Sequence, residues 1–308
     1  MRSLARSTAK RLGETLLAST VARPRRMKGH ALILAYHNVV PNDLEGLADR
    51  SLHLPWSRFL RQLDLLQKHC TIRRLEDLLR EGPDPEQPTI AITFDDAYRG
   101  AVQLALPEVS RRGLPATLFV APGLLGARSF WWDELASETP GLPEGVRQAA
   151  LNEHQGDGDR ILAALRPQRR SAPLPRWLGC ATAEEVLALD AHPGIQLGAH
   201  SWSHRNLTLL SDSALDIELT RPLDWLRNHG VSGSISLAYP YGLTTATVTA
   251  RAAATGYSAG LLVEGGWFTG ATGTNWDVPR YNVPAGLSTD GFRLRLSGYW
   301  VRHNGGAS

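Results

Sequence analysis

Residues 88–96 read Pro-Thr-Ile-Ala-Ile-Thr-Phe-Asp-Asp, an apolar, β-rich run that ends on two adjacent carboxylates. Six further runs of this kind recur along the chain, at residues 31–39, 116–121, 195–199, 235–239, 258–263 and 277–283. Most are followed by segments with the three- and four-residue apolar spacing of helices, at 56–69, 101–112, 181–190, 211–229 and 244–255. Strands that alternate with helices form parallel sheets. We therefore expect an α/β core of seven parallel strands, built either as a doubly wound sheet or as a barrel.

The alternation stops between the third and fourth runs. Residues 123–193 lie there and are too many for a simple connection between neighbouring strands. We expect a small helical insertion in this segment, placed over one end of the core.

The composition is that of an ordinary globular protein, with 43% hydrophobic and 20% charged residues in 308. A chain of this size buries a core without disulfides, so Cys70 and Cys180 are expected to be free thiols, which fits a reducing compartment. No stretch resembles a signal peptide or a membrane span. The sequence thus predicts a cytoplasmic protein whose residues 29–308 form one folded domain.

The net charge of +3 is unevenly distributed. Residues 1–28 carry eight Lys or Arg and one Glu, which leaves 25 basic and 29 acidic residues in 29–308. A slightly acidic body offers no basic face to nucleic acid, so we expect no such partner, and nothing indicates an obligate protein partner. Apolar residues interleave with the cations of the arm, residues 1–28. We expect a helix there, either resting peripherally on anionic lipid at the inner membrane or packed on the outside of the core.

Metal-ligand side chains follow two of the predicted strands. Asp95 and Asp96 end one run, and His200-Ser201-Trp202-Ser203-His204 follows another. Two histidines four residues apart can present both imidazoles to one point, and adjacent carboxylates are costly to bring together without a cation nearby. Each pattern alone is more often a helix cap or a surface pair. Together they predict a catalytic metal site with open coordination positions.

Two further segments follow strands in the same sense. His37 ends the first run, and Tyr239-Pro240-Tyr241-Gly242 ends the fifth. Because the carboxyl ends of parallel strands face one way, these groups are expected to lie near the Asp and His side chains. His37 alone is equally well explained as a satisfied buried histidine.

These motifs resemble those of the polysaccharide deacetylases of carbohydrate esterase family 4, the NodB homology domain. Residues 93–96 are similar to the first motif of the family, 200–204 to the second and 239–242 to the third, in the same order and with similarly large spacings. The resemblance spans about residues 30–285. Leu34-Ala35-Tyr36-His37-Asn38-Val39 resembles the exopolysaccharide-type branch, which has an N-terminal Tyr-His motif. The resemblance implies a distorted (β/α)7 barrel with a helical insertion after the third strand. It also implies removal of N-acetyl groups from an N-acetylhexosamine-containing polysaccharide or lipid-linked glycan.

The resemblance further implies roles for individual residues. Asp96, His200 and His204 would hold a divalent metal, with zinc as the default and cobalt, nickel or iron also suited to these ligands. Asp95 would be the general base for a water whose pKa the metal lowers, and the backbone N–H of Tyr241 would help to hold the oxyanion. The late Leu-x-His motif of the family is absent. His37 would therefore protonate the leaving amine, as in the branch with the Tyr-His motif.

The sequence departs from the family at two positions. Ala97 stands where Gly usually follows Asp-Asp, a change that a turn tolerates if φ is negative there. Ala238 replaces the Arg that begins the third motif in many members, so nothing local orients Asp95. Arg280, in the seventh run, is predicted to take the place of that Arg.

Several other interpretations deserve comparison. Residues 256–260 match the G-x-S-x-G nucleophile elbow, but a helix precedes them and a strand follows, the reverse of the required order. An iron oxygenase can use two histidines and one carboxylate, but it gives the second Asp no role. Trp131 and Trp132, with Pro240 and Tyr241, are candidate substrate contacts, although two core tryptophans explain the pair as well. The alternatives left open are a metal-dependent hydrolase of another non-peptide C–N bond, such as a sugar deformylase or cyclic amidase, and a catalytically silent glycan-binding protein.

Overall fold

The computed structural model describes residues 28–49, 51–136, 142–165, 172–270 and 275–297. Residues 1–27, nearly all of the basic arm, lie outside these ranges, so the helix predicted there is not described. Among the described residues, no helix has the length and apolar character needed to cross a membrane.

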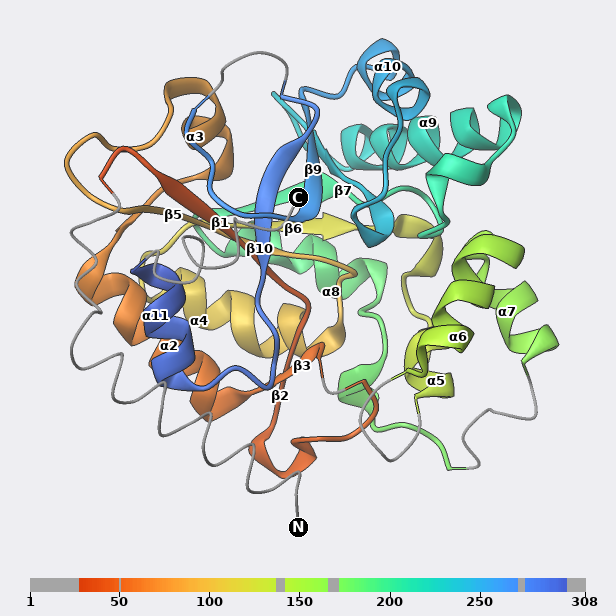
Figure 1. The fold of residues 1–308 in the computed structure, drawn as a ribbon, viewed down its shortest axis with the longest axis horizontal. Coiled ribbons are helices and arrows are strands. Elements are labelled where there is room, and N and C mark those ends of the chain that lie inside the picture. The colour runs from red at the N-terminus through yellow and green to blue at the C-terminus, as the bar shows by residue number, and fades with distance from the viewer. Residues whose placement is uncertain (1–27, 50, 137–141, 166–171, 271–274, 298–308) are drawn as a thin grey trace.

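Seven parallel strands form a closed barrel at the centre of the molecule (Figure 1). They are β1 (Ala31–Tyr36), β5 (Thr89–Phe94), β6 (Ala116–Val120), β7 (Ile195–Ala199), β8 (Ser236–Ala238), β9 (Ala259–Gly265) and β10 (Val278–Asn282). The strands pair in the order β5, β6, β7, β8, β9, β10, β1, and β1 pairs again with β5 along its whole length. This last pairing closes the ring. It excludes the doubly wound sheet and confirms the predicted NodB-type (β/α)7 barrel.

The ring is distorted between β5 and β6. The short strand β4 (Thr71–Ile72) pairs with the start of β5, whereas β6 pairs with β5 only at Thr93 and Phe94. The carboxyl end of β5, directly before Asp95, thus pairs with Thr117 and Leu118 in the first part of β6.

Helices cover the outside of the barrel (Figure 1). They are α2 (Trp56–His69), α3 (Leu75–Glu81), α4 (Leu106–Arg111) with the preceding π-helical turn η3 (Ala101–Ala105), α9 (Asp212–Asn228), α10 (Ala246–Thr255) and α11 (Thr289–Leu296). In α2 the helical spacing buries Phe59, Leu63 and Leu66 on one face. Burial of each such side chain contributes roughly 1.5–3 kcal/mol, enough to hold the helix on the barrel. Gly256 ends α10 at φ 106°, in the left-handed region that glycine adopts most easily, and β9 follows.

The insertion between β6 and β7 consists, in its described residues, of short helices joined by loops, as predicted. It comprises η4 (Pro122–Leu124), α5 (Trp131–Leu135), α6 (Glu144–Gln148), η5 (Ala149–Glu153), α7 (Gly158–Ala164), η7 (Arg176–Leu178), α8 (Ala183–Leu187) and η8 (Ala188–Ala191). Helices α5, α6 and α7 lie together at one side of the barrel (Figure 1). A capping box between Thr182 and Glu185 fixes the start of α8.

The first apolar run differs from the prediction. Residues 31–39 do not form one strand, because the chain breaks at His37 into β1 and β2 (Asn38–Val40). Strand β2 pairs with β3 (His53–Pro55) in a small parallel sheet of its own. These strands of three residues are too short to give a periodic signal, which is why the sequence did not predict them as a separate sheet.

Alternation along the strands decides which side chains enter the barrel. In β1, Leu32 and Leu34 belong to the core beneath the helices, whereas Ala31 and Ile33 belong to a second buried cluster inside the ring. That interior cluster also contains Ala91, Phe119, Ala238, Ala259, Leu261 and Val278 of the other strands, together with Leu75, Leu78 and Leu79 of α3 and Phe268. Gly198 leaves space for this filling, since a Cβ there would lie 2.6 Å from the Phe119 ring. Because every second side chain of a strand points to the same side, the residues that follow these inward positions at the strand ends also point inward.

Candidate active site

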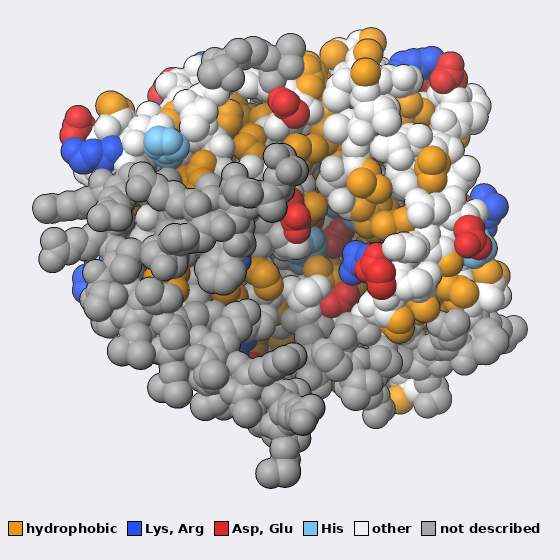
Figure 2. All heavy atoms as spheres, viewed as in Figure 1, with side chains coloured by type: hydrophobic (Ala, Val, Ile, Leu, Met, Phe, Trp, Pro, Cys, Tyr) orange, Lys and Arg blue, Asp and Glu red, His pale blue; other side chains and the backbone are white. Residues whose placement is uncertain are grey.

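A cavity of about 540 Å³ opens where the strand ends meet. His37, Asp95, His200 and Arg280 continue the inward-facing alternation of β1, β5, β7 and β10, and the first three line this cavity. Figure 2 shows His and acidic side chains in a hollow near the middle of the face drawn. A second cavity, of about 430 Å³, is lined by the amino-terminal half of β7 and by η8 and contains none of the predicted site residues.

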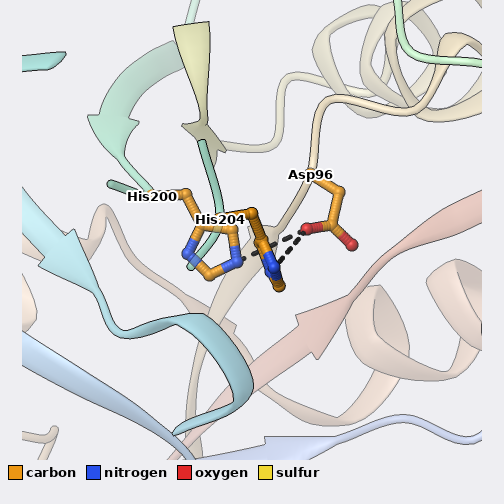
Figure 3. Close-up of side chains that lie close together, drawn as sticks. All are labelled: Asp96, His200 and His204. Atoms are coloured by element: carbon orange, nitrogen blue, oxygen red, sulfur yellow. Dashed lines mark ion pairs between the residues drawn. The ribbon is translucent and has the colours of Figure 1, made fainter. Parts of the chain in front are cut away.

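Asp96, His200 and His204 converge on one point (Figure 3). The Nε2 atoms of His200 and His204 lie 3.4 and 3.2 Å from Oδ1 of Asp96, and the candidate ligand atoms are all within 4.8 Å of one another. All three side chains are buried. Oδ1 of Asp96 and Nδ1 of His204 have no hydrogen-bond partner among the described residues. A buried carboxylate oxygen that faces two imidazoles and makes no hydrogen bond is costly alone and well suited to a divalent cation, so these residues fit a metal.

A hydrogen bond on the ring nitrogen that faces away from Asp96 fixes the orientation of His200. Its Nδ1 lies 2.7 Å from the carbonyl oxygen of Ala238, which can only accept, so Nδ1 carries the proton and Nε2 is left as a ligand. Burial alone would lower the pKa of His200, but the charges of Asp95 and Asp96 outweigh it and raise that pKa. For Asp96 burial acts in the opposite direction and would raise the pKa. The nearby His204 and His200 nevertheless hold the pKa of Asp96 well below its usual range.

The loop with the two histidines has an unusual backbone. Ser201 and His204 have φ values of 60° and 57°, in the left-handed region that costs a non-glycine residue roughly 1 kcal/mol. The hydroxyl of Ser201 accepts from the backbone N–H of His204 at 3.0 Å. On the other side, Oε2 of Glu218 accepts from the backbone N–H groups of Trp202 and Ser203, both at 2.9 Å. The Ser203 hydroxyl also donates to this carboxylate.

Glu218 was not predicted from the sequence, although a signal was present. It lies on the buried face of α9 between Leu215 and Leu219, where a charged residue interrupts an otherwise apolar stripe. Buried carboxylates are almost always paired, so such an interruption indicates a structural or functional partner.

Asp95 is held by Arg280. Nη1 and Nη2 of the guanidinium donate to Oδ1 and Oδ2 of the carboxylate at 2.8 and 2.7 Å, and both side chains are buried. Arg280 also donates from Nε to the carbonyl oxygen of Leu262 at 2.6 Å. Burial would raise the pKa of Asp95, but the charge and hydrogen bonds of Arg280 lower it below its ordinary value. The carboxylate is therefore ionised at neutral pH.

The turn after Asp95 does not meet the condition under which alanine is tolerated most easily. That condition is a negative φ at position 97, whereas Asp96 and Ala97 have φ values of 70° and 53°. The alanine occupies a conformation that glycine adopts more easily. Its carbonyl oxygen accepts from the backbone N–H of Ala181 at 2.9 Å, which ties the turn to the insertion.

His37 faces the same cavity from the break between β1 and β2. Its Nδ1 is buried and has no hydrogen-bond partner among the described residues, unlike that of a satisfied buried histidine. Burial lowers the pKa of His37, and the nearby carboxylates of Asp96 and Asp95 act in the opposite direction without overcoming it.

Aromatic side chains form one wall of the cavity. Tyr241, in η10 (Pro240–Gly242), has a φ of 59°, and its ring centre lies 4.6 Å from that of His204. Trp131 donates from Nε1 to the Tyr241 hydroxyl at 3.2 Å, and the ring centre of Trp132 lies 5.0 Å from that of His204. Both tryptophans are only 6% exposed, yet both line the cavity. They therefore belong to the hydrophobic core and also form part of the cavity wall. Pro240 is buried and is not among the lining residues.

Asn282 is a second residue that the sequence did not single out. It lines the cavity, and its Oδ1 is buried without a partner in the described part of the chain. It lies two residues after Arg280 in β10, on the same face of the strand.

Comparison with solved structures finds the same fold in several proteins whose names describe them as deacetylases or that align over most of their length. PplD from Streptococcus pyogenes, in complex with acetate, aligns with a TM-score of 0.61 at 18% identity, over 87% of this chain and 98% of that one. IcaB from Ammonifex degensii aligns with a TM-score of 0.57 at 18% identity, over 87% of this chain and 97% of that one. The BpsB deacetylase domain from Bordetella bronchiseptica aligns with a TM-score of 0.53 at 17% identity, over 83% of this chain and 97% of that one. At these identities the likeness shows a shared fold.

Comparison with curated protein sequences finds no match. The pattern of one protein family, described as polysaccharide deacetylase, does match, over residues 82–260. This range is more than half of the chain and contains Asp95, Asp96, both histidines of the 200–204 loop and Tyr241, while His37 and Arg280 lie outside it. The chain therefore belongs to the polysaccharide deacetylase family.

Proposed function

We propose that this protein is a metal-dependent deacetylase that removes N-acetyl groups from an N-acetylhexosamine-containing polysaccharide or lipid-linked glycan. The observation that carries the proposal is that two adjacent carboxylates have different partners. Asp96 faces two imidazoles and has an oxygen without a hydrogen bond, whereas Asp95 is held by a guanidinium beside the same cavity. One carboxylate is thus suited to hold a cation and the other to accept a proton.

A divalent metal held by Asp96, His200 and His204 would lower the pKa of water and polarise the amide carbonyl. Zinc suits two imidazoles and a carboxylate, and cobalt, nickel or iron fit the same donors. Asp95 would accept the proton of the attacking water, and Arg280 would keep its carboxylate ionised and correctly oriented. The backbone N–H of Tyr241 would support the developing oxyanion.

His37 is our candidate for the general acid. An amine leaves an amide only when it is protonated, so the reaction needs a proton donor beside the nitrogen. His37 lines the cavity with Asp95 and has an unpartnered Nδ1. The lowered pKa of His37 means that the protonated form is lost early as pH rises, which makes the acid step sensitive to pH.

The aromatic wall is suited to a sugar. Trp131, Trp132 and Tyr241 line the cavity together with Leu243 and Val263. Aromatic and aliphatic faces pack against the apolar faces of pyranose rings, and a cavity of about 540 Å³ lies within the usual range for a small-molecule site.

Release of acetate tests the proposal. The substrates are chitooligosaccharides, poly-N-acetylglucosamine fragments and a lipid-linked N-acetylhexosamine, each assayed with purified protein, with and without a chelator. We expect acetate from at least one substrate, abolished by chelator and restored by zinc. Acetate release that is unaffected by complete metal removal, or glycan binding without any hydrolysis, would show the proposal to be wrong.

We further propose that the basic arm places the enzyme peripherally on the cytoplasmic face of a membrane. Residues 1–28 carry eight cations and one acid, and juxtamembrane cations are worth about 1 kcal/mol each on anionic lipid. Deletion of residues 1–27 should abolish sedimentation with anionic liposomes and leave the melting temperature unchanged. A lowered melting temperature with no liposome binding by the full chain would instead indicate an arm packed on the barrel.

A further inference from the structure

Five buried side chains form a continuous hydrogen-bonded chain from β2 to the wall of the cavity. We call this chain the brace: Asn38, His53, Asp133, Tyr98 and Trp132. Each of its members is 6% exposed or less. The links are Asn38 Nδ2 to His53 Nδ1 at 3.1 Å, His53 Nε2 to Asp133 Oδ1 at 2.8 Å, Tyr98 Oη to Asp133 Oδ2 at 2.6 Å, and Trp132 Nε1 to Tyr98 Oη at 2.6 Å.

The direction of every bond in the brace is determined. Nδ2 of Asn38 also donates to the carbonyl oxygen of Trp177 at 2.9 Å, so this atom is a donor and Nδ1 of His53 accepts. Nε2 of His53 then carries the proton and donates to Asp133. The Asp133 carboxylate receives donors from His53 and Tyr98 and from the backbone N–H of Asp49 at 3.3 Å. The linked polar atoms from His53 to Trp132 are thus all paired, which fixes one arrangement of these side chains, whereas Oδ1 of Asn38 is buried without a partner among the described residues.

The brace ends on a metal-ligand candidate. The Trp132 indole is stacked on Phe130 at 4.7 Å between ring centres, donates its N–H to Tyr98, and lies 5.0 Å from the imidazole of His204. Rotation of the indole would break the hydrogen bond and the stacking together. The ring is therefore a fixed wall for His204.

Among the described residues, the imidazole of His204 has no hydrogen bond on Nδ1 that sets its orientation, so its orientation depends on packing. Metal-binding histidines usually donate their second ring nitrogen to a carbonyl or carboxylate, which sets the ring orientation. His200 follows this rule through Ala238, but Nδ1 of His204 is buried and has no hydrogen-bond partner among the described residues. The ring contacts of His204 are instead with Trp132, Tyr241 and His200.

We propose that the brace positions His204 for metal binding, in place of the missing hydrogen bond on its Nδ1. Tyr98 and Asp133 are positioning residues, and Trp132 transmits their effect by packing. The inference rests on the proposed function in taking His204 as a metal ligand. It also gives the insertion a role, because α5 carries both Trp132 and Asp133 and is tied through His53 to Asn38, the neighbour of His37.

The test is Tyr98→Phe, which removes the hydroxyl that joins Trp132 to Asp133. Tyr257→Phe is the matched control, because Tyr257 is 5% exposed and its hydroxyl donates to the Leu219 carbonyl at 2.7 Å, outside the brace and the cavity lining. Three quantities are measured on full-length protein: the melting temperature, the zinc affinity by competition with a chelator, and the imidazole NMR resonances of His204 in metal-free protein. His204→Gln assigns those resonances. Asp133→Asn serves as a second brace variant, should Tyr98→Phe fail to fold.

We expect both Tyr variants to melt at lower temperature, because Tyr257→Phe loses one buried hydrogen bond and Tyr98→Phe loses two. Only Tyr98→Phe should weaken zinc binding, by about tenfold, and shift the His204 resonances, and Asp133→Asn should act in the same direction. Wild-type zinc affinity in both brace variants, or an equal loss in Tyr257→Phe, would overturn the proposal. If the wild-type protein binds no zinc, the proposed function fails, and the His204 resonances still decide the brace: unchanged resonances in Tyr98→Phe would refute it.

Discussion

Arg280 binds both carboxylate oxygens of Asp95, at 2.8 and 2.7 Å, across 185 positions of sequence. The pair joins the end of β5 to β10 inside the barrel. Ala238, which stands where many family members have Arg, belongs to the interior cluster. Positions 238 and 280 thus face the same space, and an arginine that enters from β10 can replace one from β8.

Replacement of Arg280 by Lys keeps a positive charge and removes the two-pronged contact. We expect Asp95 to lose its fixed orientation and kcat to fall by about tenfold or more, with metal content unchanged. Loss of this contact also raises the pKa of Asp95, so the acidic limb of the pH–rate profile should move to higher pH. Arg99→Lys is the control, since Arg99 pairs with Glu185 outside the cavity lining. An Arg280→Lys enzyme with unchanged kcat and pH profile would contradict this role.

The same pair predicts the acid stability of the fold. The pKa of Asp95 is lower in the folded protein than its ordinary value of about 3.9. A lowered pKa stabilises the folded state above the unfolded value, and this stabilisation is lost as pH falls through the folded value. The stability advantage of wild type over Asp95→Asn should therefore be constant above about pH 4 and decrease as pH falls below it. An advantage at pH 2 as large as the advantage at pH 7, measured by urea unfolding, would argue against the shift.

Glu218 is predicted to preserve the shape of the histidine loop. Glu218→Gln puts an amide N–H₂ where the carboxylate accepts from the Trp202 and Ser203 N–H groups. The loop, with positive φ at Ser201 and His204, should then relax, and zinc affinity should fall by about tenfold in chelator competition. The control Asp224→Asn removes an exposed acid from the same helix and should bind zinc as wild type does. Equal affinities for Glu218→Gln and wild type would show that the loop holds its shape without this carboxylate.

The sequence predicted the seven barrel strands because each is a short, apolar, β-rich run, and most of these runs are followed by a segment with helical spacing. The alternation of strands and helices did not by itself predict closure, since only the pairing of β1 with β5 separates a barrel from an open sheet, and the barrel was predicted from the family resemblance alone. Most site residues were found because they end strands and so converge. Glu218, Asn282 and the brace were missed because their partners lie far away in sequence, as with His53 and Asp133, 80 positions apart. The φ of Ala97 could not be predicted because it depends on the tertiary contacts of the turn.

His37 is expected to matter only when the leaving group needs a proton. His37→Gln should lower kcat for an N-acetylated sugar by about 10²–10⁴, the usual contribution of a general acid. Hydrolysis of 4-nitrophenyl acetate should be little changed, because nitrophenolate leaves without protonation. The alkaline fall in kcat, which follows loss of the His37 proton at its lowered pKa, should disappear in the variant. Equal losses on both substrates would assign His37 another role.

The central claim is that Asp96 holds a metal and Asp95 serves the chemistry. The most direct measurement is metal content, by elemental analysis, together with acetate release for Asp95→Asn and Asp96→Asn beside wild type. We expect Asp96→Asn to lose both metal and activity, and Asp95→Asn to keep the metal while acetate release falls by at least about 10². Full metal in Asp96→Asn, or wild-type acetate release by Asp95→Asn, would contradict the account.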